Sequence, residues 1–519
     1  MLIIKSQRKR ALGLNEPLQH GSHKRPVTRR DFLAQGFTTG AATVIAPALL
    51  APRGAMAALD PLLASDAAAC GLTGLGGNKI PFICFDLAGG ANIAGSNVLV
   101  GQQGGQLDFL STQGYSKQGL PGNMLPNNST TNFVDTQFGL AFHADSAFLR
   151  GMLEKTSEST RARINGAVIA ARSENDTGNN PHNPMYSLAR YGVKGKLLTL
   201  IGSQNSESGG NSMAPAMSID PQFRPTKIDR VSDVTGLVDT GDVASILSAS
   251  DTVRTLESMY RLTTRKLDHV DTGLADPSAD TAIKQQIECA YLKTADTVDK
   301  FSSPAALNPS LDTNITTLLG GPTFGGDGEF QKTASVMKLV VQGNAGAGTI
   351  SMGGFDYHTG ERATGEARDL RAGRCIGACL EYAAQQPGGG VPLMIYVFSD
   401  GSLSSNGRVD DSAGGRGKGE WTGDNQQVAA SFFLVFNPLG RPTLLQAGTP
   451  AAARHQQLGY YTAGGDVVTS SSPAANNVNL LVETVLLNYM ALNGDKAMYS
   501  GPLGNGASLD GMVAFEAIV

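Results

Sequence analysis

Side chains that could bind a metal ion or activate water follow apolar, strand-like segments at several places in this 519-residue chain. The best spaced are Asp356 and His358, which are one residue apart after the segment Thr349–Met352. Residues two apart in an extended chain point the same way, so a carboxylate and an imidazole could face one ligand. Asp400 follows another apolar segment and Asp424 precedes a third. A single Asp at such a place is more often a turn or a helix cap, but the recurrence favours a shared site.

Further candidates lie close to these positions in the sequence. Asp86 is within the apolar run Ile80–Leu87, which leads into a glycine pair and then a polar loop that contains Ser96. Asn425 adjoins Asp424. Ligands in open α/β sheets bind outside the carboxyl ends of the strands, which is where this pattern predicts these side chains.

Two segments are apolar at almost every position, Ile80–Leu87 and Val391–Phe398. Continuous apolar runs of this length are typical of strands that are buried on both faces of a parallel sheet. We predict that they are neighbouring or near-neighbouring central strands. Asp356, Asp400 and Asp424 should then converge at one edge of the sheet.

Strand, loop and helix patterns alternate along the rest of the chain, which predicts a layered α/β/α domain. Helical periodicity with charged opposite faces distinguishes residues 242–302, which we interpret as a helical insertion in that domain. The other expected strands are Gly166–Ala170, Lys196–Ile201, Val336–Val341 and Phe432–Phe436, and the other expected helices are Asp145–Glu158, Arg368–Gln385 and Leu480–Leu492.

The N-terminal segment has the order of a secretory signal. Arg29 and Arg30 precede a Phe-Leu pair, the weakly apolar run Phe37–Leu50 follows, and small residues around Ala57 suit a cleavage site. The arginine pair is typical of a twin-arginine (Tat) signal. A retained membrane anchor is the alternative, but the run is short and interrupted, whereas a span needs about 20 apolar residues.

The predicted signal, residues 1–57, implies export by the Tat translocase, which carries folded proteins. The expected mature protein is residues 58–519, located in the periplasm, the cell envelope or outside the cell. Its partners there are not identified by the sequence. The signal holds nine of the 41 Lys and Arg residues and two of the 45 Asp and Glu residues, so the mature chain has 32 and 43 of them and a formal net charge of −11.

This acidic balance excludes some classes of partner. Nucleic acid and anionic lipid would be repelled by a field of the same sign. No stretch after residue 57 is long and apolar enough to cross a bilayer. We therefore expect no nucleic-acid partner and no membrane span after cleavage.

Five cysteines are present, and their odd number and wide spacing predict no disulfide framework. Cys84 lies in an apolar run and is expected in the core. Cys375 and Cys379 are four apart in a helical pattern, hence on one face. Two packed thiols are the preferred interpretation of that pair, with a metal or redox pair as the alternative.

The order of these motifs resembles a known family across nearly the whole mature chain. It is the family of Tat-exported bacterial proteins described as domain of unknown function fifteen-oh-one, in the alkaline phosphatase and sulfatase superfamily. The matching segments are Phe82–Gly90, Leu140–Ile169, Asn180–Tyr186 with His182, Gly353–His358, Ser399–Gly401, Asn406–Gly407 and Gly423–Asn425.

The resemblance implies a three-layer α/β/α fold with a site at the strand ends. In that superfamily Asp and His residues hold one or two divalent metals, and a Ser, Thr or modified Cys attacks phosphorus or sulfur. The implied ligands here are Asp356, His358, Asp400 and Asp424, with Asp86 and His182 as further candidates. An oxygen-rich set of this kind suits Mg, Ca or Mn at least as well as Zn.

Two departures from the family pattern bear on catalysis. The family continues its glycine pair with Pro-Ser-x-x-Asp, but this chain continues from Ala91 without that Ser or Asp, and Ser96 lies one residue from the Asp position. The family's late Asp-His is Asp424-Asn425 here, and Asn is a neutral, poor ligand for zinc. Alternatively, the implied ligands are the remnant of a metal site that no longer binds an ion.

Three functions remain open. The first is a metal-dependent hydrolase of phosphate or sulfate esters, with Ser96 as its nucleophile. The second is a non-catalytic descendant of that fold that binds or assembles envelope components. The third is an accessory factor in secretion or surface assembly. The two losses favour the non-catalytic descendant over the hydrolase.

Overall fold

The computed structural model describes residues 60–70, 79–126, 132–173, 181–238, 247–301, 304–499, 509 and 511–519. The predicted signal, with Arg29, Arg30 and Ala57, lies outside the described residues, as do residues 242–246 of the predicted insertion. The chain divides into two compact units, Met1–Thr73 with Thr240–Ser302 and Gly74–Asp239 with Ser303–Val519. We call them the helical unit and the sheet unit.

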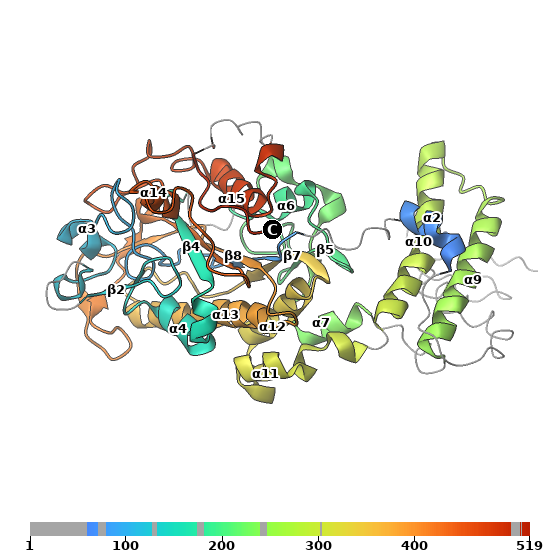
Figure 1. Ribbon diagram of the computed structural model, residues 1–519, viewed down its shortest axis with the longest axis horizontal. Helices are drawn as coiled ribbons and strands as arrows, with labels where there is room; N and C mark the ends of the chain where they lie inside the picture. Colours follow the sequence, from blue (N-terminus) through green and yellow to red (C-terminus); the bar gives the residue numbers. More distant parts are fainter. Residues whose placement is uncertain are drawn as a thin grey trace, which may run out of the picture. The chain divides into compact units, whose positions relative to one another are not determined.

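An eight-stranded mixed sheet forms the centre of the sheet unit, in the order β14-β4-β13-β8-β1-β7-β5-β6 (Figure 1). β13 is antiparallel to both neighbours, and the other pairings of this sheet are parallel. The strands are β1 (Phe82–Asp86), β4 (Ile164–Ile169), β5 (Leu198–Gly202), β6 (Thr226–Lys227), β7 (Ala345–Ser351), β8 (Leu393–Phe398), β13 (Ser431–Phe436) and β14 (Gln457–Leu458).

The two strands with continuous apolar sequence are neighbours, as predicted. β1 pairs with β8 in parallel, with Phe82 opposite Met394, and every residue of both strands is buried. Apolar side chains on alternate positions pack into helical layers on opposite faces of the sheet, which explains the lack of polar alternation.

Helices cover both faces of this sheet (Figure 1). α12 and α13 pack against β1, β7 and β8 on one face, and α4 packs on α13. α6 and α15 lie on the other face, where their apolar side chains join a core with β1, β8 and β13. The helices of this unit are α3 (Thr112–Lys117), α4 (Ala147–Lys155), α5 (Glu158–Arg161), α6 (Met185–Tyr191), α7 (Val231–Gly236), α11 (Thr313–Leu319), α12 (Gly328–Val341), α13 (Arg362–Ala384), α14 (Ala452–Gln456) and α15 (Val478–Leu492).

One predicted strand is wrong. Val336–Val341 is the last part of the helix α12 and not a strand, and β7 begins only at Ala345. Residues 333–341 are all buried, because α12 packs against the sheet and several helical segments at once. A helix that is apolar on all sides loses the periodicity by which it is recognised.

Among the described residues, three short antiparallel pairs lie outside the large sheet. They are β2 (Val134–Asp135) with β3 (Phe142–His143), β9 (Leu403–Ser404) with β12 (Gly423–Asp424), and β10 (Val409–Asp410) with β11 (Lys418–Gly419). The last two belong to the long Gly- and Ser-rich loop after β8. Because β12 pairs with β9, Asp424 lies close to the start of this loop, near the end of β8.

The helical unit contains two long helices, α9 (Ala249–Leu267) and α10 (Pro277–Lys300), that pack on each other. The short helix α2 (Ala64–Ala69), from the start of the described chain, packs on α10. The predicted insertion is thus helical where it is described, but its unit also includes residues from the N-terminal part of the chain.

A disulfide joins Cys70 to Cys289 in this unit, so the prediction from cysteine spacing needs correction for this pair. The pairing could not be recognised in the sequence, because 219 residues separate the two cysteines. Cys84, Cys375 and Cys379 are buried free thiols.

Candidate functional site

The candidate ligands come from the carboxyl ends of β7 and β8 and from the loop that follows β8. Asp356 and His358 lie in the loop after β7, and Asp400 lies two residues beyond β8. Asp424 is in β12, which pairs with β9 shortly after Asp400. The topology therefore brings together three carboxylates that are up to 68 residues apart in sequence.

His358 forms the centre of an exposed cluster with two of these carboxylates. Its Nδ1 contacts Asp356 Oδ1 and lies 3.5 Å from Asp424 Oδ1. The side chain of His358 is 30% exposed, that of Asp356 63% and that of Asp424 42%. We call these three residues the His358 cluster. Both carboxylates approach the same ring nitrogen, so the three side chains turn toward one another.

The glycine pair after β1 holds Asp400 next to this cluster. Gly89 N donates to Asp400 Oδ1 at 2.8 Å. Gly89 has φ +117°, and a Cβ there would lie 2.8 Å from Asp356 N. Only glycine fits this conformation and this close approach. The predicted convergence of Asp356, Asp400 and Asp424 is therefore present in the geometry.

Ser399 holds the same loop in place through three hydrogen bonds to its backbone. Its Oγ accepts hydrogen bonds from Gly90 N at 3.2 Å and Ala91 N at 2.9 Å, and donates to Leu87 O at 2.7 Å. The hydroxyl thus uses its donor and acceptor capacity on backbone groups. It stabilises the strand end and is not available as a nucleophile in this arrangement.

Asp86 is fully buried at the end of β1 and binds a loop of its own unit. Its Oδ2 accepts from Asn211 N at 2.7 Å and Ser212 N at 2.8 Å, and its Oδ1 accepts from Ser212 Oγ at 2.9 Å. Burial raises the pKa of Asp86 to about 6, and the negative charge of Asp400 adds to this effect. These contacts give Asp86 a structural role.

His182 is a second buried candidate. Its ring stacks on Phe398 at the end of β8, with centroids 5.9 Å apart. Neither ring nitrogen has a hydrogen-bond partner among the described residues. Burial lowers the pKa of His182 to about 4, so the ring is neutral near pH 7. His182 is therefore buried beside Phe398, with both ring nitrogens unpaired among the described residues.

Asn425 does not take the place of the family's histidine. Its side chain accepts a hydrogen bond from Gln427 N at 3.0 Å and so caps a short helical turn. Its backbone N donates to Ser402 O at 2.8 Å. Asn is preferred at such capping positions for this reason.

Ser96, the predicted nucleophile, is fully buried. Its Oγ accepts hydrogen bonds from Asn92 Nδ2 at 2.6 Å and from Arg362 Nη2 at 3.1 Å. Ser96 therefore belongs to the surroundings of Arg362 and not to the His358 cluster. Sequence spacing could not show this, because Arg362 is 266 residues away.

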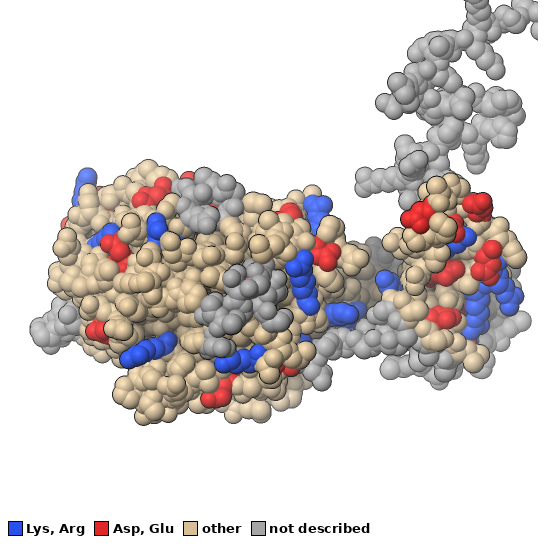
Figure 2. Space-filling view, turned by 90° about the horizontal axis from the view of Figure 1, so that it is seen from above, with Lys and Arg blue, Asp and Glu red and all other residues tan. Residues whose placement is uncertain are grey.

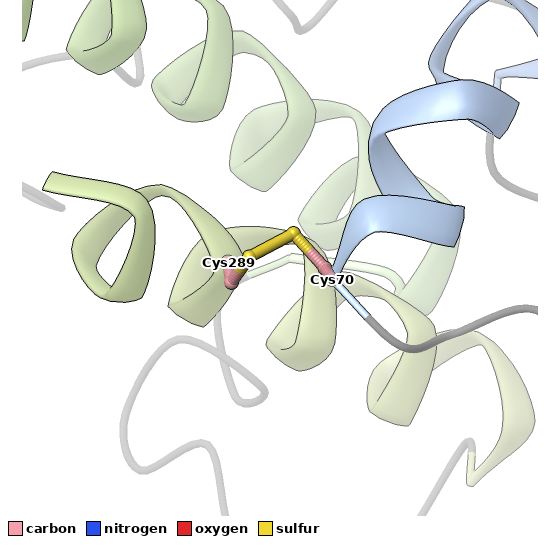
Figure 3. Close-up of a disulfide and its surroundings, with 2 residues drawn as sticks. All are labelled: Cys70 and Cys289. Atoms are coloured by element: carbon pink, nitrogen blue, oxygen red, sulfur yellow. A yellow bond between two sulfur atoms is a disulfide. The ribbon is translucent and has the colours of Figure 1, made fainter. Parts of the chain in front are cut away.

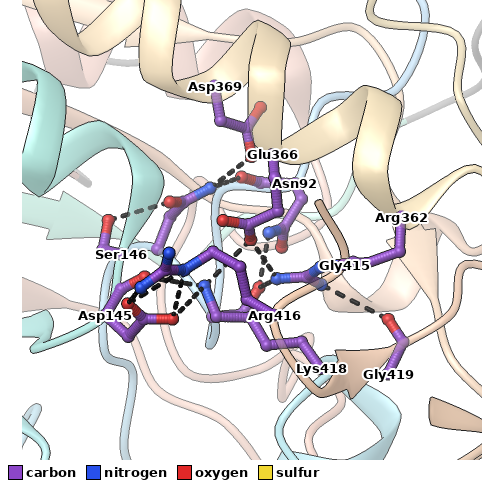
Figure 4. Close-up of polar contacts among 12 residues, drawn as sticks. Asn92, Asp145, Ser146, Arg362, Glu366, Asp369, Gly415, Arg416, Lys418 and Gly419 are labelled. Atoms are coloured by element: carbon purple, nitrogen blue, oxygen red, sulfur yellow. Dashed lines mark hydrogen bonds and ion pairs between the residues drawn. The ribbon is translucent and has the colours of Figure 1, made fainter. Parts of the chain in front are cut away.

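A network of charges that is buried at its centre and partly exposed at its edge surrounds Arg362 (Figure 4). Glu366 Oε1 is 2.6 Å from Arg362 Nη2 and 2.9 Å from Lys418 Nζ, and Arg362 and Lys418 are almost completely buried. Burial alone would raise the pKa of Glu366, but Arg362 and Lys418 outweigh it and the pKa is lowered. We use the name Arg362 network for Arg362, Glu366, Lys418, Asp145, Arg150 and Arg416.

Part of this network could have been predicted from the sequence. Arg362 and Glu366 have the i, i+4 spacing of a helical ion pair, but the helix was expected to begin only at Arg368. α13 in fact begins at Arg362. The missed residues 362–367 include the two central charges, Arg362 and Glu366.

Tyr357, between Asp356 and His358 in the sequence, is buried. Its hydroxyl donates to Asp369 Oδ1 at 2.6 Å and accepts from Asn92 N at 3.0 Å. Burial raises the pKa of Asp369 to about 7. Because Tyr357 is buried while Asp356 and His358 on either side are partly exposed, it anchors the loop that presents them.

The candidate ligands are not arranged as a metal centre in this geometry. Among the described residues, no group of three or more His, Cys, Asp or Glu side chains is placed to hold an ion. Asp356 and Asp424 approach His358 Nδ1, and Asp400 Oδ1 accepts from Gly89 N. Asp356 and Asp424 thus face the same ring nitrogen, whereas Asp400 contacts the glycine pair after β1.

The surface gives further information on partners. On the face shown in Figure 2, the described charges form small groups of both signs within a broad uncharged area. Nucleic-acid binding relies on continuous basic surface, which the described part of that face lacks. No described helix is long and apolar enough to cross a membrane.

A scan against protein-family models and a search of curated proteins found no match to the chain. What the protein does must therefore be inferred from its own residues and their geometry.

Proposed function

We propose that this chain is an exported protein of the cell envelope, with an alkaline-phosphatase-like fold and a degenerate metal site. It acts as a non-catalytic binding or assembly protein, of the kind that serves secretion. The observation that carries the proposal is the position of Ser96. A nucleophile must reach both the substrate and the groups that activate it. Ser96 is buried and bonded to Asn92 and Arg362, apart from the His358 cluster.

The contacts of Asp86 and Asp400, the acidic residues at or just beyond the ends of β1 and β8, also support a non-catalytic function. Asp86 accepts three hydrogen bonds from residues 211–212, and Asp400 accepts one from Gly89. Contacts of this kind hold loops in place. The exposed His358 cluster and the loops around it remain accessible and are the part of the site suited to contact a partner.

The second candidate function is a metal-dependent hydrolase of phosphate or sulfate esters. The observation that favours it is the convergence of Asp356, Asp400 and Asp424 with His358 after β7 and β8. A rearranged His358 cluster with Asp400 would supply three carboxylates and one imidazole to Mg, Ca, Mn or Zn. Such an ion would lower the pKa of bound water and neutralise charge on the ester.

A hydrolysis assay separates the two functions. Purified residues 58–519 would be tested with chromogenic phosphate and sulfate esters, with each of the four metals added in turn. We expect the esters to be hydrolysed no faster than in buffer without the protein. Metal-dependent release that disappears in His358→Ala but persists in His269→Ala, a matched histidine outside the site, would establish the hydrolase instead.

Export is part of the proposal and has its own support. The Cys70–Cys289 disulfide suits an oxidising compartment outside the cytoplasm. Tat recognition requires the guanidinium pair, which Lys does not replace. Changing Arg29 and Arg30 to Lys should leave precursor in the cytoplasm, whereas Arg10→Lys should not. Export of the double variant at the normal level would contradict the Tat assignment.

A further inference from the structure

The first described residues form an arm on the helical hairpin of α9 and α10. We define the arm as residues 60–70, which include α2. At one end Asp60 N donates to Glu257 Oε1 at 2.6 Å, and the Asp60 carboxylate pairs with Arg261. At the other end Cys70 is bonded to Cys289 of α10 (Figure 3).

Between these ends, Asp66 of the arm forms a hydrogen bond with Tyr260 of α9, and several apolar side chains of the arm are buried. Leu63 and Cys70 join a small buried cluster with Tyr260, Cys289 and Leu292. The two bonded cysteines are thus part of the core that they close. A core of this size is typical of small units that need a covalent staple.

The covalent end is the stronger attachment. α2 has six residues, fewer than a helix needs to persist by itself in water. The Arg261 side chain is 46% exposed, and exposed ion pairs contribute little. Neither local helix formation nor the pair at Asp60 can therefore hold the arm as the disulfide does.

We propose that the Cys70–Cys289 disulfide is a redox-controlled lock that fixes the arm to the hairpin, and that its reduction releases the arm and uncovers the apolar surface at Tyr260 and Leu292. The lock opens when an external dithiol gives two electrons and two protons to the Cys70–Cys289 bond and itself becomes a disulfide, and it closes by the reverse exchange. The lock itself does not depend on the proposed function.

The other cysteines do not compete for this chemistry. Cys84, Cys375 and Cys379 are buried in the sheet unit, and burial raises the pKa of each thiol. Thiol–disulfide exchange proceeds through the thiolate, so these three react slowly. Among the described cysteines, Cys70 and Cys289 are the pair joined by a bond that a reductant can open.

Hydrogen exchange on purified residues 58–519 tests the lock. With the bond intact, the arm should be protected; after mild reduction, its amides should exchange at least about tenfold faster, while β1 and β8 do not change. Peptide mapping without reductant should find Cys70 bonded to Cys289. Alkylation of both cysteines in oxidised protein, or unchanged exchange of the arm after verified reduction, would overturn the proposal.

Matched variants distinguish how much each end of the arm contributes to holding it on the hairpin. Cys70→Ser should reproduce the exchange of the reduced protein, and Arg261→Ala should keep the slow exchange of the oxidised protein. Should Cys70→Ser fail to fold, reduction of the folded wild type gives the same comparison. Equal release of the arm by Arg261→Ala and by Cys70→Ser would show that the polar end holds it, which contradicts the lock.

Discussion

The sheet unit holds two polar clusters that use similar side chains in opposite ways. In the Arg362 network, Arg362 and Lys418 are almost completely buried, and Glu366 bonds to both. In the His358 cluster, all three side chains are 30% exposed or more. A buried network is costly to disturb and holds segments together, whereas exposed groups can exchange partners with little cost. The candidate nucleophile Ser96 contacts the first, and three of the four candidate ligands form the second.

The largest effect should come from breaking the buried cluster. Arg362→Met keeps much of the side-chain length but leaves Glu366 without one of its cations and Ser96 without a donor. We expect a loss of about 3–5 kcal/mol in the free energy of unfolding. Urea denaturation measures it.

The exposed cluster provides the control for that measurement. Asp356→Asn removes one carboxylate from His358, and we expect a change within about 1 kcal/mol because the pair is exposed. Similar losses in Arg362→Met and Asp356→Asn would contradict the division into a structural and an accessible cluster.

A smaller, pH-dependent effect should follow from Asp86→Asn. The folded pKa of about 6 is above the ordinary value of 3.8, so ionisation of Asp86 disfavours the folded state as pH rises from about 4 to about 6. Asn keeps an oxygen for the amides of residues 211–212 and carries no charge.

The variant should therefore be more stable than wild type at pH 8, by about 1–3 kcal/mol, and show no gain at pH 4. Thermal or urea unfolding at both pH values measures the difference. A gain that is larger at pH 4 than at pH 8 would mean that Asp86 is stabilised as a carboxylate, as a ligand of a bound cation would be.

Much of the sheet unit was predictable because its strands have a simple apolar pattern. β1 and β8 were recognised as buried neighbours, and parallel topology then placed Asp356 and Asp400 at one edge. α12 was missed because a helix buried on several sides resembles a strand in its Val-rich part.

The partners within the site were less predictable than its location. Ser96 accepts a hydrogen bond from Arg362, and Cys70 forms a disulfide with Cys289, in both cases with a partner more than 200 residues away. Spacing along the chain carries no information on such contacts. The contact of two carboxylates with the same nitrogen of His358 likewise depends on how two loops meet.

The most direct test of the non-catalytic assignment is a thermal melt of wild type and Asp400→Asn, each with and without a chelator. Asn can still accept from Gly89 N, but it removes a charge that repels Asp86. Without a bound metal, the chelator should leave the wild-type Tm unchanged, and Asp400→Asn should melt about 1–3 °C higher. A wild-type Tm that falls with chelator, together with an Asp400→Asn variant that melts lower and no longer responds, would contradict the assignment and establish a working metal site.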